Sequence, residues 1–131
     1  MALDPNLRSA LAVTLGAIPG ALSRYYLSLW AARWLGEGFP FGTFLVNVSG
    51  SFLMGLIVTL AMTRNLITPE LRLLLTVGFL GSYTTFSTYA LDTHLLLRVG
   101  FFGQTLIYGV GSLVLGVVAV ELGALLARSL P

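Results

Sequence analysis

Four long apolar segments divide the chain, and they constrain its fold more than any other feature. They cover residues 9–32, 39–63, 71–97 and 99–127, and only short polar or glycine- and proline-containing stretches separate them. An α-helix needs about 20 residues to cross the roughly 30 Å of hydrocarbon in a bilayer. Each segment reaches this length. The sequence therefore predicts an all-α membrane protein with four transmembrane helices in a single transmembrane domain, residues 1–131.

The composition excludes most classes of soluble protein. Hydrophobic residues make up 56% of the chain and charged residues 9%, whereas soluble domains contain about 45–50% and 25%. The basic residues are seven scattered arginines and no lysine, so no nucleic acid partner is expected. Residues 1–8 lack the basic start and cleavage site of a signal peptide, so the first segment is expected to remain as a helix. We expect a multi-pass protein of the cell inner (plasma) membrane.

The arginines give little orientation signal. An even number of spans places both ends of the chain on one side, and cytoplasmic loops normally carry the excess of positive charge. One side would hold four arginines and the other three: Arg8, Arg64, Arg72 and Arg128 on the first, and Arg24, Arg33 and Arg98 on the second. This near-balance permits insertion in both orientations.

The third segment contains a run of polar residues that is unusual in mid-membrane. From Gly81 to Tyr89, seven of nine side chains carry a hydroxyl group. A glycine followed by β-branched threonines makes a poor continuous helix. A helix broken near residues 81–85, with backbone carbonyls freed to hold an ion, is therefore predicted. The alternative is that these hydroxyls bond back to the backbone of their own helix.

Polar side chains also recur every four residues on two other segments, where they share a helix face. These stripes are Thr43, Asn47 and Ser51 on the second segment, and Gln104, Tyr108 and Ser112 on the fourth. An amide in the membrane is costly without a partner. Asn47 must therefore bond either to a neighbouring helix or to water or an ion in a polar pathway.

The stripes contain no acidic residue and no lysine, and this pattern favours an anion. Neutral donors can replace the water around an anion without trapping it. Phe86 and Tyr89 would share a face if the helix resumes there, and the positive edge of an aromatic ring can contact a small anion. Arg24 could draw anions into a vestibule, although an arginine near the membrane interface can equally reach the headgroups.

Pairs of small residues predict where helices approach each other closely. Three pairs are spaced four apart: Gly16 with Gly20, Ser51 with Gly55, and Ser112 with Gly116. Ordinary helix packing is sufficient to explain most of them.

At these residues the chain resembles the Fluc (CrcB-type) fluoride channels. The most specific stretches are GTFLVN at residues 42–47 and GFLGSYTTFSTY at residues 78–89. Supporting stretches are GALSRY at residues 20–25 and YGVGS at residues 108–112. The resemblance extends over all four apolar segments. It implies a fluoride-selective ion channel that exports cytoplasmic fluoride passively and so lowers its concentration and toxicity.

The resemblance also implies an architecture and a set of site residues. Two subunits would insert into the membrane lipid in opposite directions, as an antiparallel dual-topology homodimer with two fluoride pathways along its interface. The implied pathway residues are Asn47, Phe86, Tyr89, Tyr108 and Ser112, with Thr43 beside them and Arg24 at the vestibule. Tyr89 stands where the family has a second phenylalanine, so a hydroxyl is added beside the pathway.

A structural cation is implied as well. The family holds a central Na⁺ with backbone carbonyls, which correspond here to those of Gly81 and Thr84 of both subunits. No side-chain ligand is needed for such a site.

Three other readings have weaker support. A small multidrug-type proton-coupled transporter needs a carboxylate within the membrane, and the acidic candidates Asp92 and Glu121 are expected towards helix ends. A non-transporting membrane assembly subunit would explain the small residues but not the hydroxyl run. An enzyme is not expected, because His94 is the single histidine and no pairing of a nucleophile with a base is visible.

Overall fold

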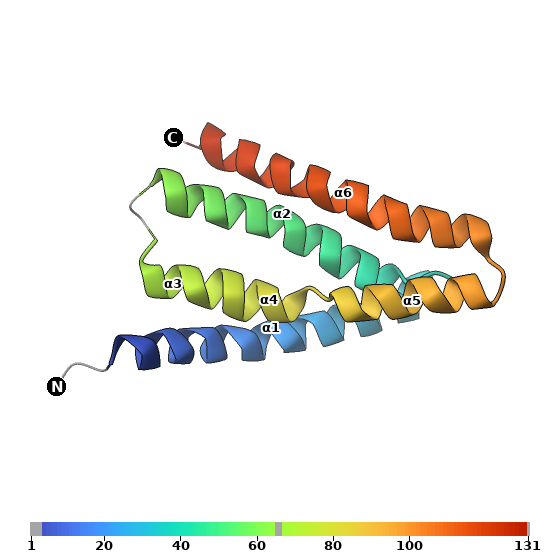
Figure 1. Ribbon diagram of the computed structural model, residues 1–131, viewed down its shortest axis with the longest axis horizontal. Coiled ribbons are helices and arrows are strands. Elements are labelled where there is room, and N and C mark those ends of the chain that lie inside the picture. Colours follow the sequence, from blue (N-terminus) through green and yellow to red (C-terminus); the bar gives the residue numbers. More distant parts are fainter. Residues whose placement is uncertain (1–3, 65–66, 131) are drawn as a thin grey trace.

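The chain folds into four helical rods that lie side by side (Figure 1). The computed structural model describes residues 4–64 and 67–130. The first, second and fourth rods are single helices: α1 (Pro5–Leu35), α2 (Phe41–Thr63) and α6 (Phe102–Ser129). The third rod is divided into α3 (Pro69–Leu73), the π-helix η1 (Leu74–Leu80), α4 (Gly81–Tyr83) and α5 (Phe86–Arg98). No strand occurs among the described residues, so the prediction of an all-α fold is confirmed. Residues 1–3, 65–66 and 131 of the predicted transmembrane domain lie outside them.

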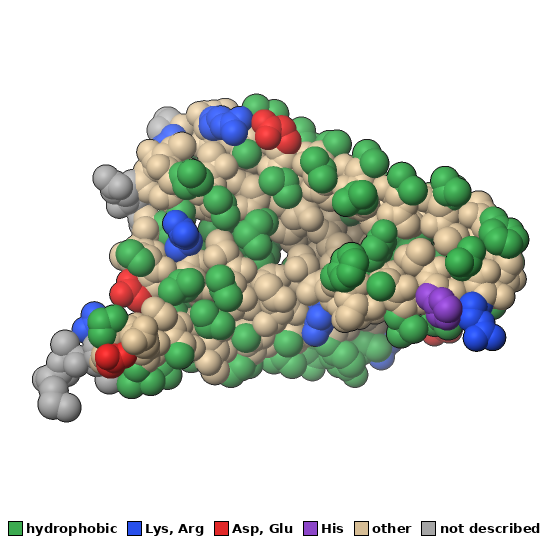
Figure 2. All heavy atoms as spheres, viewed as in Figure 1, with side chains coloured by type: hydrophobic (Ala, Val, Ile, Leu, Met, Phe, Trp, Pro, Cys, Tyr) green, Lys and Arg blue, Asp and Glu red, His purple; other side chains and the backbone are tan. Residues whose placement is uncertain are grey.

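The exterior of this bundle is largely apolar. Within the described residues, α2 and α6 are long and apolar enough to cross a membrane, whereas α1 has the length but not the apolarity. Leu106, Ile107 and Leu113 on α6 are each about two-thirds exposed. Hydrophobic side chains are spread along the molecule, and most charged ones lie towards its two ends (Figure 2). A continuous apolar surface of this kind faces lipid or another protein.

Both ends of α1 follow from local sequence. The side chain of Asp4 caps the helix, because its Oδ1 accepts hydrogen bonds from the backbone N–H groups of Asn6 and Leu7 at 2.9 and 3.3 Å. Pro5 then occupies the first turn, where its missing N–H is harmless. The helix ends at Gly36, whose φ of +84° is a conformation that favours glycine.

The π-helix η1 lies directly against α1. Its i→i+5 hydrogen bonding is rare and occurs in short pieces within α-helices, often at functional sites. A Cβ atom at Gly16 would lie 2.1 Å from the carbonyl oxygen of Leu74, and one at Gly20 would lie 2.2 Å from that of Phe79. No side chain can occupy those positions. The predicted Gly16–Gly20 pair therefore sets the spacing between α1 and η1.

The same device joins α2 to α6. A Cβ atom at Gly55 would lie 2.0 Å from the carbonyl oxygen of Val120, and one at Gly123 would lie 2.0 Å from that of Phe52. At Gly116 the nearest atom is the Ser51 hydroxyl at 3.5 Å, which is ordinary contact. Close glycine contacts thus fix α2 on α6 and α1 on η1, and this arrangement positions the interrupted third rod.

Candidate functional site

The third rod is interrupted at Thr84 and Thr85. α4 ends at Tyr83 and α5 begins at Phe86, and the two threonines between them have extended backbones, with φ/ψ of −80°/158° and −149°/121°. Gly81 is helical, with φ −63° and ψ −30°. The expectation that the glycine marks the turn is therefore wrong, because the chain leaves the helix one turn later.

Asn47 bonds to the backbone at this interruption. Its Nδ2 donates to the carbonyl oxygen of Thr85 at 3.0 Å, and its Oδ1 accepts from the N–H of Thr85 at 2.8 Å. One side chain on α2 thus satisfies both backbone groups of a single residue on the third rod. The second Nδ2 hydrogen is not used in these two bonds and remains available to a ligand.

A hollow of about 500 Å³ opens beside the interruption. We call it the break hollow, and the lining residues that matter here are Asn47, Thr85, Phe86, Tyr89 and Ser112. Phe86 is 79% exposed, and its ring centroid lies 5.6 Å from that of Tyr89. Ser112 is buried, and its hydroxyl has no hydrogen-bond partner among the described residues. A buried hydroxyl without a partner is unfavourable, so this group is ready to bond to a ligand.

A row of polar side chains leads away from the break hollow. The Tyr89 ring lies 5.5 Å from that of Tyr108, centroid to centroid, and its hydroxyl donates to the carbonyl oxygen of Gly109 at 2.7 Å. The Tyr108 hydroxyl donates to Asp92 Oδ2 at 3.1 Å, and the Thr43 hydroxyl donates to the same oxygen at 2.8 Å. We call Tyr89, Tyr108, Thr43 and Asp92 the polar row.

Asp92 is the member of this row that the sequence analysis missed. It was expected towards a helix end, yet it is the central residue of α5 (Phe86–Arg98) and bonds to two of the predicted site residues. Its spacing from Phe86 and Tyr89, at i+6 and i+3, could have placed it on the face of the aromatic pair. The expectation that the polar stripes meet no acidic group is therefore wrong.

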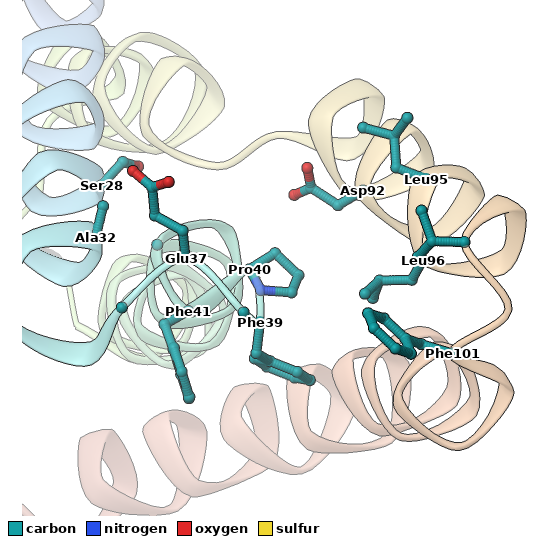
Figure 3. Close-up of a pocket in the computed structure, with 14 residues that line it drawn as sticks. Ser28, Ala32, Glu37, Phe39, Pro40, Phe41, Asp92, Leu95, Leu96 and Phe101 are labelled. Atoms are coloured by element: carbon teal, nitrogen blue, oxygen red, sulfur yellow. The ribbon is translucent and has the colours of Figure 1, made fainter.

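A second hollow, of about 440 Å³, lies beyond Asp92 near the end of the bundle. We call it the end hollow and define it by Ser28, Glu37, Asp92, Leu96 and Phe101. The Asp92 side chain projects from α5 towards the side formed by Ser28 and Glu37 (Figure 3). The polar row thus connects the break hollow at mid-rod with the end hollow.

Two residues of the sequence-based set lie apart from this route. Arg24 lines neither hollow, and within the described residues it makes no hydrogen bond or ion pair. Gln104 is exposed and lines neither hollow. One chain therefore brings together Asn47, Phe86, Tyr89, Ser112, Tyr108 and Thr43, but it does not bring Arg24 to them.

Comparisons with known proteins cover nearly the whole chain. The family model described as CrcB-like protein, Camphor Resistance (CrcB), matches residues 11–124. A protein of Synechocystis sp. named fluoride-specific ion channel FluC is 58% identical over 98% of both chains. Proteins of the same name from Synechococcus sp. and Trichormus variabilis are 56% and 52% identical, over 96% and 98% of this chain and 97% and 94% of theirs.

Proposed function

The chain belongs to the CrcB-like family, and we propose from that membership that it is a fluoride-specific ion channel through which cytoplasmic fluoride leaves the cell passively. The observation that carries the proposal is the polar route through an otherwise apolar bundle. It runs from the break hollow along the polar row to the end hollow. By the name of its family the protein is a channel and not an enzyme.

The break hollow offers fluoride neutral donors in place of water. The Ser112 hydroxyl has no other partner in the described chain, and Asn47 keeps one N–H free beyond its two bonds to Thr85. The Phe86 and Tyr89 rings stand beside these donors, and their positive edges add a weak attraction. Neutral groups of this kind hold an anion without a fixed countercharge, so the anion can leave again.

Asp92 gives the route a different character at its far end. The Thr43 and Tyr108 hydroxyls both donate to its carboxylate. An anion that reaches them must compete with a carboxylate for the same two donors. Asp92 therefore sets how readily these hydroxyls turn towards a passing anion.

An antiparallel dual-topology homodimer is the second part of the proposal. Around the interruption Gly81, Phe86, Ser87 and Thr88 are exposed, and hydroxyls facing lipid are unfavourable. Within one chain, the atom nearest to a Cβ at Gly81 would be the carbonyl oxygen of Thr76 at 3.7 Å, so nothing crowds this glycine. A second copy of the chain would cover the exposed hydroxyls and give a reason for a glycine there. Arg24, which lies apart from the route in one chain, would line a vestibule of this dimer.

The third part is a structural Na⁺ at the centre of the dimer. The residues that would hold it are Gly81 and Thr84 of each subunit, through their backbone carbonyls. The extended conformation of Thr84 and Thr85 ends the helical hydrogen bonding around these carbonyls, and oxygen donors alone suit an alkali cation. When bound, Na⁺ would supply positive charge that offsets the converging carbonyl dipoles.

We place the protein in the inner (plasma) membrane with four spans, α1, α2, the third rod and α6. At 1.5 Å per residue, the 31 residues of α1 are longer than the roughly 30 Å of hydrocarbon. With both orientations present in one dimer, each subunit meets the same pair of membrane surfaces as its partner.

Anion efflux from liposomes tests the channel function. Purified protein is reconstituted in vesicles loaded with potassium fluoride or potassium chloride, with valinomycin present to carry the balancing K⁺. Rapid loss of fluoride with negligible loss of chloride is expected at equal pH on both sides. Chloride loss of similar size, or fluoride loss only under a pH gradient, would refute the proposal. The second outcome would favour a proton-coupled carrier, for which Asp92 supplies the carboxylate within the bundle.

A further inference from the structure

Two side chains at the interruption take hydrogen bonds that would otherwise continue the helix. In an unbroken α-helix the N–H of residue i bonds to the carbonyl oxygen of residue i−4. The N–H groups of Thr85 and Thr88 would then bond to Gly81 and Thr84. In the structure the Thr85 N–H donates to Asn47 Oδ1 at 2.8 Å, and the Thr88 N–H donates to Thr85 Oγ1 at 3.2 Å.

These are the two carbonyls assigned to the central cation in the proposed function, on which this inference rests. We infer that Asn47 and Thr85 are positioning residues that hold the third helix open and so leave the carbonyls of Gly81 and Thr84 free for that cation. Neither side chain touches the cation. Each acts by giving an alternative acceptor to an N–H group.

Asn47 is suited to this role because it satisfies both sides of the interruption. It accepts from the Thr85 N–H, and its Nδ2 donates to the Thr85 carbonyl oxygen at 3.0 Å. Since its second N–H remains for an anion in the break hollow, one amide links the cation-binding carbonyls to the anion route. The peptide group between Thr84 and Thr85 is shared, because its carbonyl faces the cation and its N–H bonds to Asn47.

Thr85 acts as the cap of α5. Its hydroxyl oxygen accepts from the Thr88 N–H, as an N-cap residue does. The neighbouring Thr84 is of the same type but acts differently, since its hydroxyl donates to the carbonyl oxygen of Leu80 at 2.9 Å. Thr84 therefore provides a matched control for Thr85.

The test compares Asn47→Leu and Thr85→Val with Thr84→Val in purified full-length protein. Threonine-selective ¹³C labelling reports the backbone directly, because Cα and Cβ chemical shifts distinguish extended from helical residues. The remaining interruption threonines should move towards helical shifts in Asn47→Leu and Thr85→Val, and should stay extended in Thr84→Val. The Na⁺ concentration that gives half-maximal thermal stabilisation should rise at least tenfold in the first two variants and less than threefold in the third.

Several results would overturn the inference. Extended shifts together with an unchanged Na⁺ response in Asn47→Leu and Thr85→Val would show that other contacts hold the helix open. Thermal stability independent of Na⁺ in the parent protein would refute the cation site. If Asn47→Leu does not assemble, Asn47→Asp keeps the acceptor for the Thr85 N–H and should leave the interruption extended; helical shifts there would also refute the role of that bond.

Fluoride efflux from the same preparations separates this inference from the proposed function. A parent protein that passes no fluoride would reject the channel, whereas the carbon shifts would still decide whether Asn47 and Thr85 hold the helix open.

Discussion

Replacing Ser112 with alanine should change stability and transport in opposite directions. The Ser112 hydroxyl is buried and has no partner in the described chain. Leaving a buried polar group unsatisfied costs about 1–3 kcal/mol. Ser112→Ala removes the unsatisfied group with little loss of volume, so the protein should become more stable by about 1 kcal/mol, a rise in Tm of roughly 3–5 °C.

The same change should reduce fluoride transport. If the free hydroxyl donates to fluoride in the break hollow, its loss removes a hydrogen bond to a charged group, which is worth about 1.5–3 kcal/mol. That energy corresponds to a roughly ten- to 150-fold weaker interaction, since about 1.4 kcal/mol is tenfold. Initial efflux at fluoride concentrations below saturation, measured with a fluoride electrode, should fall within that range.

Ser49→Ala is the matched control on the neighbouring helix. Its hydroxyl lies 2.6 Å from the carbonyl oxygen of Leu45 and 2.8 Å from the Tyr83 hydroxyl, so it has partners. Ser49→Ala should therefore lose about 1 kcal/mol of stability while fluoride efflux stays close to that of the parent. If Ser112→Ala instead lowered the Tm and left efflux intact, Ser112 would be a structural residue and the reasoning would be wrong.

Three further predictions concern the aromatic pair and the glycine contacts. Phe86→Ile should lose conduction while the dimer still assembles, because it keeps an apolar side chain but removes the ring edge; normal efflux would show that ring electrostatics are irrelevant. Tyr89→Phe should conduct at least as well as the parent but lose about 1 kcal/mol of stability, since its hydroxyl bonds to the Gly109 carbonyl; reduced efflux would give that hydroxyl a direct role in transport. Gly20→Ala should prevent stable assembly in size-exclusion chromatography, because its Cβ would lie 2.2 Å from the Phe79 carbonyl oxygen; a normal elution profile would contradict the close packing of α1 on η1.

Sequence pattern was sufficient for the helices and for much of the site. The apolar segments predicted the helical fold, and the four-residue spacing of Asn47 and Ser51 placed both on the face that lines the break hollow. Local periodicity succeeds there because a helix face depends only on spacing along one helix. Membrane crossing by all four rods, the dimer and the cation stay predictions, since a single chain does not test them.

The position of the interruption and the partners of Asn47 could not be read in this way. Gly81 looked like the turn, but the chain turns where Asn47 on another helix competes for the Thr85 N–H. Asp92 was misjudged for a similar reason, since its importance comes from the hydroxyls of Thr43 and Tyr108 on α2 and α6. Contacts between helices decide both, and these contacts are invisible to the periodicity of one segment.

The π-helix η1 has a consequence for how the chain tolerates length changes. A π-turn accommodates one more residue than an α-turn does, so residues after Leu80 are one position out of phase with those before Leu74. Deleting a single residue within η1 would let an ordinary α-helix form there. Everything downstream would then rotate by about 100°, the angle between successive residues of an α-helix, and Thr85 would turn away from Asn47. A one-residue deletion in η1 should therefore be far more harmful than a deletion in the connection between α1 and α2, and natural length variation should avoid residues 74–80.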